Sequence, residues 1–196
     1  MVSNFERSIT IKYVRAGKKN QCDYKVVTEI LTEYELIVDS CEQTRERPGE
    51  NQEQKKYYSG KKKSHTFKNQ LIVLPLGKDI VDVIAGKLGP SSDISLFKEQ
   101  QKGFEAQQKF KGDKGYVGAS SMRTPQKKPR NQELTFEQKQ RNQELSSARI
   151  FVEHIIRMLK IFRVAQERFR LNPQKYEQII LTICGLVRLR IGGLIL

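Results

Sequence analysis

The feature that most constrains the fold is a change of hydrophobic period along the chain. Three short runs, apolar or alternating, come first, and we expect each to form a β-strand: residues 35–40, 64–76 and 77–89. Strands that follow one another with turns between them favour an antiparallel meander. From residue 146 to residue 169 the apolar side chains instead recur at helical spacing, and Pro173 stands near the start of a last helix. The change of period therefore predicts an α/β layer arrangement with a mixed sheet.

The segments between these elements complete the expected order. Residues 90–104 begin with Pro90 and show helical spacing, with Ser91 or Ser92 as the capping residue. Residues 109–118 predict a short strand that runs into a glycine-rich turn. Thr135 and Gln138 have the spacing of a capping box at the start of the long helix. Two polar stretches are expected to be loops, residues 41–63 and 124–135. The apolar stripe of the long helix consists of Val152, Ile155, Ile156 and Leu159.

The charge of the chain points to a polyanionic partner. Among 196 residues the formal net charge is +14, and such an excess of Lys and Arg favours nucleic acid. Ribosomal and membrane-surface proteins share this property, so charge alone does not select one function. Three cysteines at wide spacing, Cys22, Cys41 and Cys184, predict neither a disulfide framework nor a zinc site.

Neither end of the chain suggests a membrane or secretory segment. The N-terminus lacks the apolar core of a signal peptide. The apolar C-terminal segment, residues 179–196, contains Arg188 and Arg190, which would cost several kcal/mol in lipid. We therefore expect a buried helix there, no membrane partner, and a cytoplasmic protein with reduced thiols.

Three acidic residues are candidates for metal-dependent chemistry. Asp39 and Asp113 each end a predicted strand, and Glu153 lies on the long helix. Taken singly, the aspartates are ordinary turn residues, and Glu153 belongs to a solvated face with ion pairs to Arg149 and Arg157. Together they can converge at one end of the sheet, where hard oxygen ligands suit Mg²⁺. Two such ions about 4 Å apart can bind the attacking and the leaving oxygen of a phosphoryl displacement.

Five segments in order resemble the DDE endonuclease domain of bacterial insertion-sequence transposases. The sequence LIVDSCEQTRERP resembles the block of the first aspartate, and KGDKGYVG that of the second. RIFVEHIIRMLKIFR resembles the glutamate helix, and QKKYYSGKKKSHTFKNQLIV and GPSSDISLFKEQ resemble the blocks between. Arg149, Glu153 and Lys160 also match a Tyr-Arg-Glu-Lys spacing, in which Ser146 replaces the tyrosine. The separations of the three acids, 74 and 40 residues, suit this family.

The resemblance implies an RNase H-like mixed sheet, an antiparallel meander of three strands plus a further strand, flanked by helices. It implies that Asp39, Asp113 and Glu153 bind two Mg²⁺ ions, for which Mn²⁺ can substitute. It further implies cleavage of double-stranded DNA at transposon ends and strand transfer into target DNA, in a bacterial cytoplasm at the nucleoid. Asp93 matches a recurrent acidic position, and we expect a structural role for it at the start of its helix. The residues expected to contact DNA are Lys61, Lys62, Lys63, Arg149, Arg157 and Lys160.

The resemblance covers residues 35–196, which we expect to be the catalytic domain. Residues 1–34 are then a remnant or linker of an N-terminal DNA-binding region that members of the family carry. Partners implied in this way are a second copy of the chain and an N-terminal half made from a split gene. Two alternatives remain open. One is an inactive DNA-binding remnant of a truncated or split transposase, and the other is a host nuclease without inverted repeats beside its gene.

Overall fold

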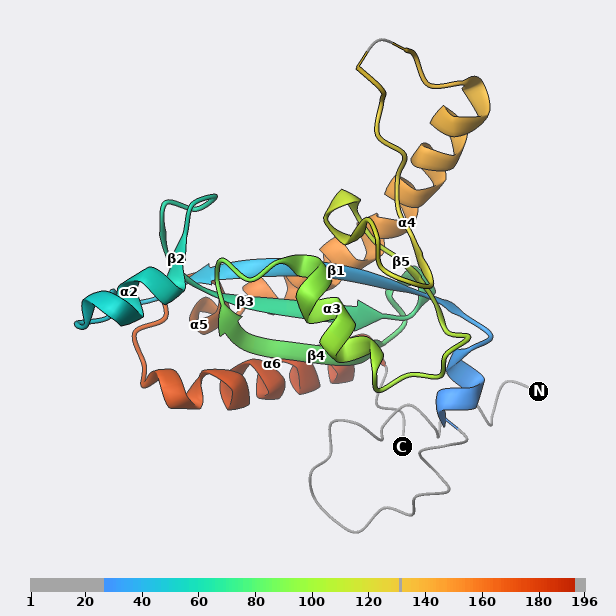
Figure 1. The fold of residues 1–196 in the computed structure, drawn as a ribbon. Coiled ribbons are helices and arrows are strands. Elements are labelled where there is room, and N and C mark those ends of the chain that lie inside the picture. Colours follow the sequence, from blue (N-terminus) through green and yellow to red (C-terminus); the bar gives the residue numbers. More distant parts are fainter. Residues whose placement is uncertain (1–26, 131, 193–196) are drawn as a thin grey trace.

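The computed structural model describes residues 27–130 and 132–192, in which helices cover a twisted sheet (Figure 1). A short helical segment, residues 27–31, precedes the first strand. The strands are β1 (Glu35–Thr44), β2 (Tyr58–Ser59), β3 (Ser64–Val73), β4 (Ile80–Leu88), β5 (Lys109–Lys111) and β6 (Met122–Arg123). The α-helices are α2 (Asn51–Tyr57), α3 (Asp93–Gln101), α4 (Phe136–Lys160), α5 (Arg163–Gln166) and α6 (Tyr176–Arg190). Single 3₁₀ turns are η2 (Pro75–Gly77), η3 (Lys114–Tyr116) and η4 (Pro173–Lys175).

The sheet is mixed, as the sequence predicts. Its strand order is β2-β3-β1-β5-β6, and β4 also pairs with β3. β1, β3 and β4 form the expected antiparallel meander. β5 adds to β1 in parallel, and β6 adds to β5 in parallel. The α/β class and the meander are therefore confirmed, and the sheet has two short strands, β2 and β6, beyond those expected.

Hydrophobic cores lie on both faces of the sheet because successive strand side chains point to opposite sides. Along β1, Ile37 belongs to a core with α4, α5 and α6. Its neighbours Leu36 and Val38 belong to a second core, which includes Phe97 of α3. The stripe of α4 that was expected to be buried, Val152, Ile155, Ile156 and Leu159, is buried against the first face.

The ends of the long helix differ in how well local sequence determines them. Thr135 caps α4, and its side chain and that of Gln138 form the predicted capping box. The expected continuation to residue 169 is wrong, because α4 ends at Lys160 and the short α5 follows. The amide of Gln43 on β1 donates to the carbonyl oxygens of Val164 (2.7 Å) and Glu167 (2.8 Å). These contacts with a distant strand favour a break that helical periodicity does not indicate.

The expectation of a loop over residues 41–63 is also wrong in part. β1 continues to Thr44, and α2 and β2 follow within the same stretch. Residues 40–44 are polar, but they pair with β3 from Gln70 back to Thr66, and this tertiary pairing extends the strand. α2 buries none of its side chains, so no apolar period marks it in the sequence.

The C-terminal helix is attached to the sheet by an internal ion pair. Arg188 binds Asp79 through two hydrogen bonds of 2.6 and 2.7 Å, and both side chains are almost fully buried. Arg188 therefore points into the protein. The expected buried helix over residues 179–196 is buried on one face only, because Leu186 and Leu189 are exposed, and residues 193–196 lie outside the described residues. Within residues 27–130 and 132–192 no helix has the length and apolarity that a membrane crossing requires.

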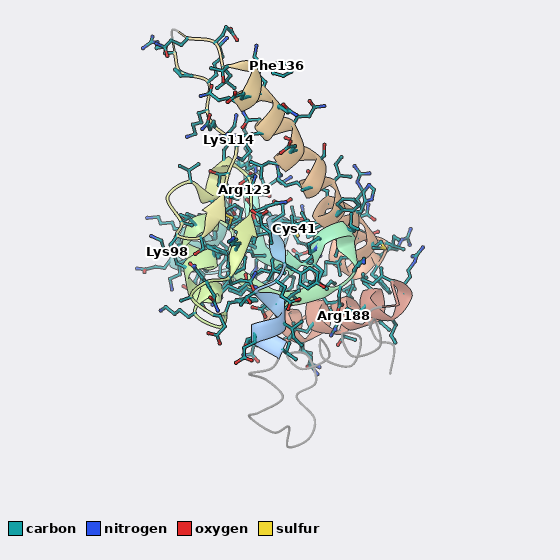
Figure 2. The ribbon with its side chains drawn as sticks, turned by 90° about the vertical axis from the view of Figure 1, so that its right-hand side faces the viewer. Cys41, Lys98, Lys114, Arg123, Phe136 and Arg188 are labelled. Carbon is teal, nitrogen blue, oxygen red and sulfur yellow. The ribbon has the colours of Figure 1, made fainter. Side chains whose placement is uncertain are left out.

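One part of the molecule projects from this layered body. The N-terminal half of α4 rises away from the sheet beside the segment that precedes it (Figure 1), and Phe136 lies near its far end (Figure 2). We call α4 up to Leu145, with residues 124–130, the arm. The amide of Asn142 exchanges two hydrogen bonds with the backbone of Gln126, of 2.9 and 3.1 Å. These bonds fasten the incoming chain to the helix.

Candidate active site

The register of two parallel strands brings Asp39 and Asp113 to the same place. The last paired residues of β1 and β5 are Ile37 and Lys111. Each aspartate follows its strand's last paired residue by two positions, so the two lie next to each other where the parallel pairing ends. The sheet thus explains why two strand-end acids far apart in the sequence converge.

Helix α4 brings the third candidate acid to this place. Arg149 and Glu153 are one helical turn apart, and Arg149 Nη2 lies 3.6 Å from Glu153 Oε1. The same nitrogen lies 3.8 Å from Asp39 Oδ2. Arg149 therefore bridges a carboxylate of the sheet and a carboxylate of the helix. Its Nε is buried and has no hydrogen-bond partner within the described part of the chain.

The electrostatics of Asp39 agree with the proximity that the β1–β5 register and the Arg149 bridge give the three acids. Burial raises the pKa of Asp39 to about 6, against the opposing effect of the Arg149 guanidinium and of the Ser40 N–H. The Asp113 and Glu153 carboxylates raise the pKa of Asp39 further. Like charges disfavour ionisation only when they are close. Asp39, Asp113 and Glu153 therefore share one electrostatic environment.

Local turn structure determines the position of Asp113. It caps η3, and its Oδ1 accepts a hydrogen bond of 2.7 Å from the Gly115 N–H. A Cβ at Gly115 would lie 2.9 Å from Asp113 Oδ1 and 2.9 Å from Asp93 Oδ2. Only glycine fits there without a shift, so the GDKGY turn holds Asp113 close to Asp93. Tyr116, which ends η3, is fully buried, and its hydroxyl accepts a hydrogen bond of 3.2 Å from the side-chain amide nitrogen of Gln70.

The donor set suits a divalent metal ion by chemistry. Asp and Glu oxygens are the hard ligands that Mg²⁺ and Mn²⁺ take in proteins. Among residues 27–130 and 132–192, however, no three His, Cys, Asp or Glu side chains are already arranged to hold an ion. The Arg149 guanidinium lies between the Asp39 and Glu153 carboxylates instead. Binding of an ion by both carboxylates would therefore require Arg149 to move out from between them.

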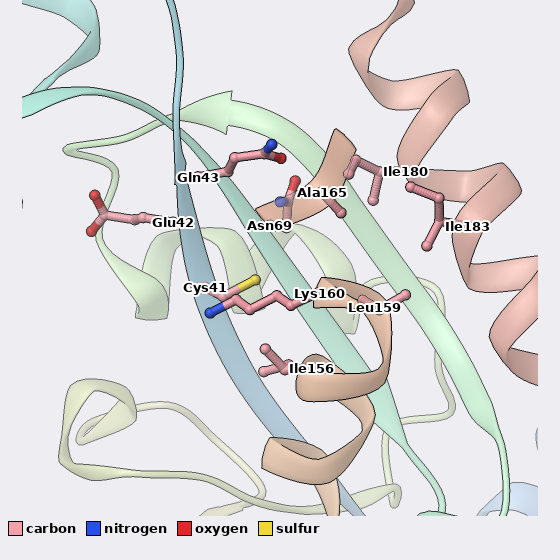
Figure 3. Close-up of a pocket in the computed structure, with 10 residues that line it drawn as sticks. All are labelled: Cys41, Glu42, Gln43, Asn69, Ile156, Leu159, Lys160, Ala165, Ile180 and Ile183. Atoms are coloured by element: carbon pink, nitrogen blue, oxygen red, sulfur yellow. The ribbon is translucent and has the colours of Figure 1, made fainter. Parts of the chain in front are cut away.

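The other residues predicted to contact DNA fall into two groups. Arg157 and Lys160 are exposed on the part of α4 that follows Glu153. Figure 3 shows Lys160 beside Cys41, in a small, mostly apolar pocket between β1, α4 and α6. Lys61, Lys62 and Lys63 are exposed in the turn that joins β2 to β3. Of the residues predicted to contact DNA, the structure therefore brings only Arg149 into contact with the candidate acids, at Asp39 and Glu153.

Two residues next to the acids were not identified from the sequence. Ser40 donates from its Oγ to Asp93 Oδ1 at 2.6 Å, and Lys68 Nζ lies 3.1 Å from the same oxygen. Lys68 is buried in β3. The available signal was a lysine inside the run SHTFKNQLIV, which is otherwise a buried strand. A lysine there requires an internal partner, and Asp93 is that partner.

Comparisons with known proteins agree on one family. A family model described as DDE superfamily endonuclease matches residues 38–188. A probable transposase for insertion sequence element IS702, from Microchaete diplosiphon, is 37% identical over 145 residues, which is 72% of this chain and 51% of that protein. The chain thus spans about half the length of this curated relative. No solved structure matches the chain.

Proposed function

This chain belongs to the DDE superfamily of endonucleases, and on that premise we propose that it cleaves DNA with divalent metal ions held by Asp39, Asp113 and Glu153. The observation that carries the proposal is the register of β1 and β5. It places Asp39 and Asp113 together where their parallel pairing ends, and α4 adds Glu153 through the Arg149 bridge. Like charges repel, and Arg149 contacts only two of the three carboxylates, so a bound cation would explain why all three converge.

The chemistry divides between the ions and the chain. Bound Mg²⁺ supplies a Lewis acid and lowers the pKa of bound water, which suits hydrolysis of a phosphodiester. Asp39, Asp113 and Glu153 would hold the ions and offset most of their charge. Arg149, once displaced from between Asp39 and Glu153, would be free to bind the scissile phosphate through its planar guanidinium.

We further propose that the DNA cut in this way is a transposon end and that the freed 3′-hydroxyl attacks target DNA. Support comes from the similarity to a probable insertion-sequence transposase. The duplex would run along α4 past Arg157 and Lys160, with the β2–β3 turn and its three lysines as a second phosphate contact. These exposed cations fit a polyanion without base specificity.

The test is nicking of plasmid DNA by the purified chain in Mg²⁺ or Mn²⁺. The decisive variant is Glu153→Gln, and Glu167→Gln is its matched control. Glu167 also pairs with an arginine one turn away, Arg163 at 3.5 Å, but it is exposed and lies at the end of the short helix α5. We expect nicking by the parent and by Glu167→Gln, and none by Glu153→Gln. Full activity of Glu153→Gln would refute the assignment.

A second candidate is a DNA-binding chain without activity of its own. It is favoured by one observation, that the Arg149 guanidinium lies between the Asp39 and Glu153 carboxylates. Such a chain would nick no DNA under any condition tested. It would still bind DNA of any sequence, with an affinity that falls steeply as salt is raised.

A further inference from the structure

A hydrogen-bonded cluster beside the aspartates is not used by the proposed chemistry. Its centre is Asp93 Oδ1, which accepts from Ser40 Oγ at 2.6 Å and from Lys68 Nζ at 3.1 Å. Lys68 also donates to the carbonyl oxygen of Ser91. The Lys68 side chain is only 9% exposed. A lysine with so little access to water is costly unless it is paired, so the ion pair fixes Asp93 at the start of α3.

Asp93 contacts the surroundings of both aspartates. On one side it binds Ser40, the residue after Asp39, and the Ser40 N–H donates to Asp39 Oδ1 at 2.9 Å. On the other side Asp93 Oδ2 faces Gly115, where it and Asp113 Oδ1 border the same small space. One oxygen of Asp93 is therefore directed to the strand that carries Asp39, and the other to the turn that carries Asp113.

The pairing of β1 with β5 does not itself fix the distance between Asp39 and Asp113. The β1–β5 pairing ends at Ile37 and Lys111, so no ladder hydrogen bond fixes the backbone at Asp39 relative to the backbone at Asp113. The two carboxylates repel each other when both are ionised. Some other group has to hold them at a constant separation.

We infer that Asp93, held in place by Lys68, is a positioning residue that sets the separation of the Asp39 and Asp113 carboxylates. The inference rests on the proposed function and assigns Asp93 no contact with the substrate or the ion. Residues that orient metal ligands through hydrogen bonds commonly affect metal affinity or activity by about 10- to 100-fold.

The test compares Ser40→Ala and Asp93→Asn with a matched control. Ser40→Ala removes the hydroxyl that donates to Asp93 and leaves the buried ion pair intact, so we expect it to fold even if Asp93→Asn does not. The control is Glu99→Gln, because Glu99 lies on the same helix and its pair with Lys87, at 2.8 Å, is exposed. Mn²⁺ binding is measured by electron paramagnetic resonance in the absence of DNA. The kcat and KM of nicking are measured with DNA. The melting temperature is measured on the same samples.

We expect Mn²⁺ to bind Ser40→Ala and Asp93→Asn about tenfold or more weakly, with lower kcat and unchanged KM for DNA. Glu99→Gln should match the parent in all three. Lys68→Arg keeps the charge pair and should retain Mn²⁺ affinity better than Asp93→Asn. A purely structural role would lower the melting temperature and leave the Mn²⁺ affinity of the folded protein unchanged.

Failure of this inference is distinguishable from failure of the proposed function. If the parent binds Mn²⁺ and nicks DNA, and both variants do so equally well, the positioning role alone is overturned. If the parent neither binds Mn²⁺ nor nicks DNA, the proposed function fails, and the positioning role falls with it.

Discussion

Two aspartate–arginine pairs in this protein use the same groups in opposite ways. Asp79 and Arg188 meet through two short hydrogen bonds in the interior, and Asp79 Oδ1 also accepts from the Ile80 N–H at 2.8 Å. Asp39 and Arg149 are 3.8 Å apart, and the arginine is shared with a second carboxylate. The first pair satisfies its charges completely. The second leaves oxygen atoms and an arginine nitrogen available to other partners.

Burial acts on both aspartates in the same direction. It raises the pKa of Asp79, and the Arg188 hydrogen bonds and charge oppose it. It also raises the pKa of Asp39, which is then raised further by two neighbouring carboxylates. The interior pair is therefore a structural element, whereas the Asp39 carboxylate has too little compensating positive charge. A site that is to receive a cation has this property.

The largest effect is expected where the interior pair is broken. Arg188→Met leaves the Asp79 carboxylate buried without its partner, which should lower the free energy of unfolding by about 3–5 kcal/mol. Urea denaturation of parent and variant measures this. The double variant Asp79→Leu with Arg188→Met removes both charges and should recover most of the loss. An unchanged midpoint in Arg188→Met would show that the two pairs are not as different as their geometry indicates.

The next largest effect is a gain in stability, and it depends on pH. In the metal-free protein the pKa of Asp39 is about 6, above its ordinary value of 3.8. Between these two pH values the folded state holds a proton that the unfolded state has lost, so ionisation destabilises the fold as pH rises. Asp39→Asn should therefore be more stable than the parent at pH 7.5 by up to about 3 kcal/mol, and the gain should vanish near pH 3.5.

Denaturation in EDTA at these two pH values measures the effect. The same variant should lose DNA nicking, so stability and activity move in opposite directions. A variant that is less stable than the parent at pH 7.5 would contradict the idea that Asp39 carries uncompensated charge.

The smallest effect on stability is expected at Arg149, which has the longer of the two aspartate–arginine contacts. Arg149→Gln removes a partly exposed pair at long distance, and such pairs contribute about 0–1 kcal/mol. We expect little change in the urea midpoint. Mn²⁺ should bind this variant more tightly than the parent, because no guanidinium competes for Asp39 and Glu153. Calorimetric titration with Mn²⁺ checks the sign, and weaker binding would mean that Arg149 supports the acids instead of occupying their shared space.

Features that depend on nearby residues could be predicted from the sequence, and features that depend on distant partners could not. Local patterns gave the meander strands, the Thr135 cap and the buried stripe of α4, because each depends on residues close together in the chain. The acids Asp39, Asp113 and Glu153 were selected by their motifs, and the register of β1 and β5 provides a physical reason for their proximity.

Features that depend on distant partners were missed. The break after Lys160 requires the Gln43 amide of β1, and the burial of Lys68 requires Asp93. No periodicity of the α4 segment or of β3 records those partners. The C-terminal helix was expected to be buried, but the pairing of its Arg188 with Asp79, 109 residues away, could not be predicted from a pattern of apolar residues.

The construction of the arm has a consequence for how chains of this kind can change in length. Glu153 is held by the stripe from Val152 to Leu159 packed on the sheet, and the incoming segment is fastened to α4 by Asn142 and Gln126. Residues 127–130 and 132–134 are therefore separated from the acids by this attachment. Insertions there should leave the fold and the three acids unchanged. A fluorescent protein domain inserted after Lys127 should therefore leave the positions of the carboxylates unchanged.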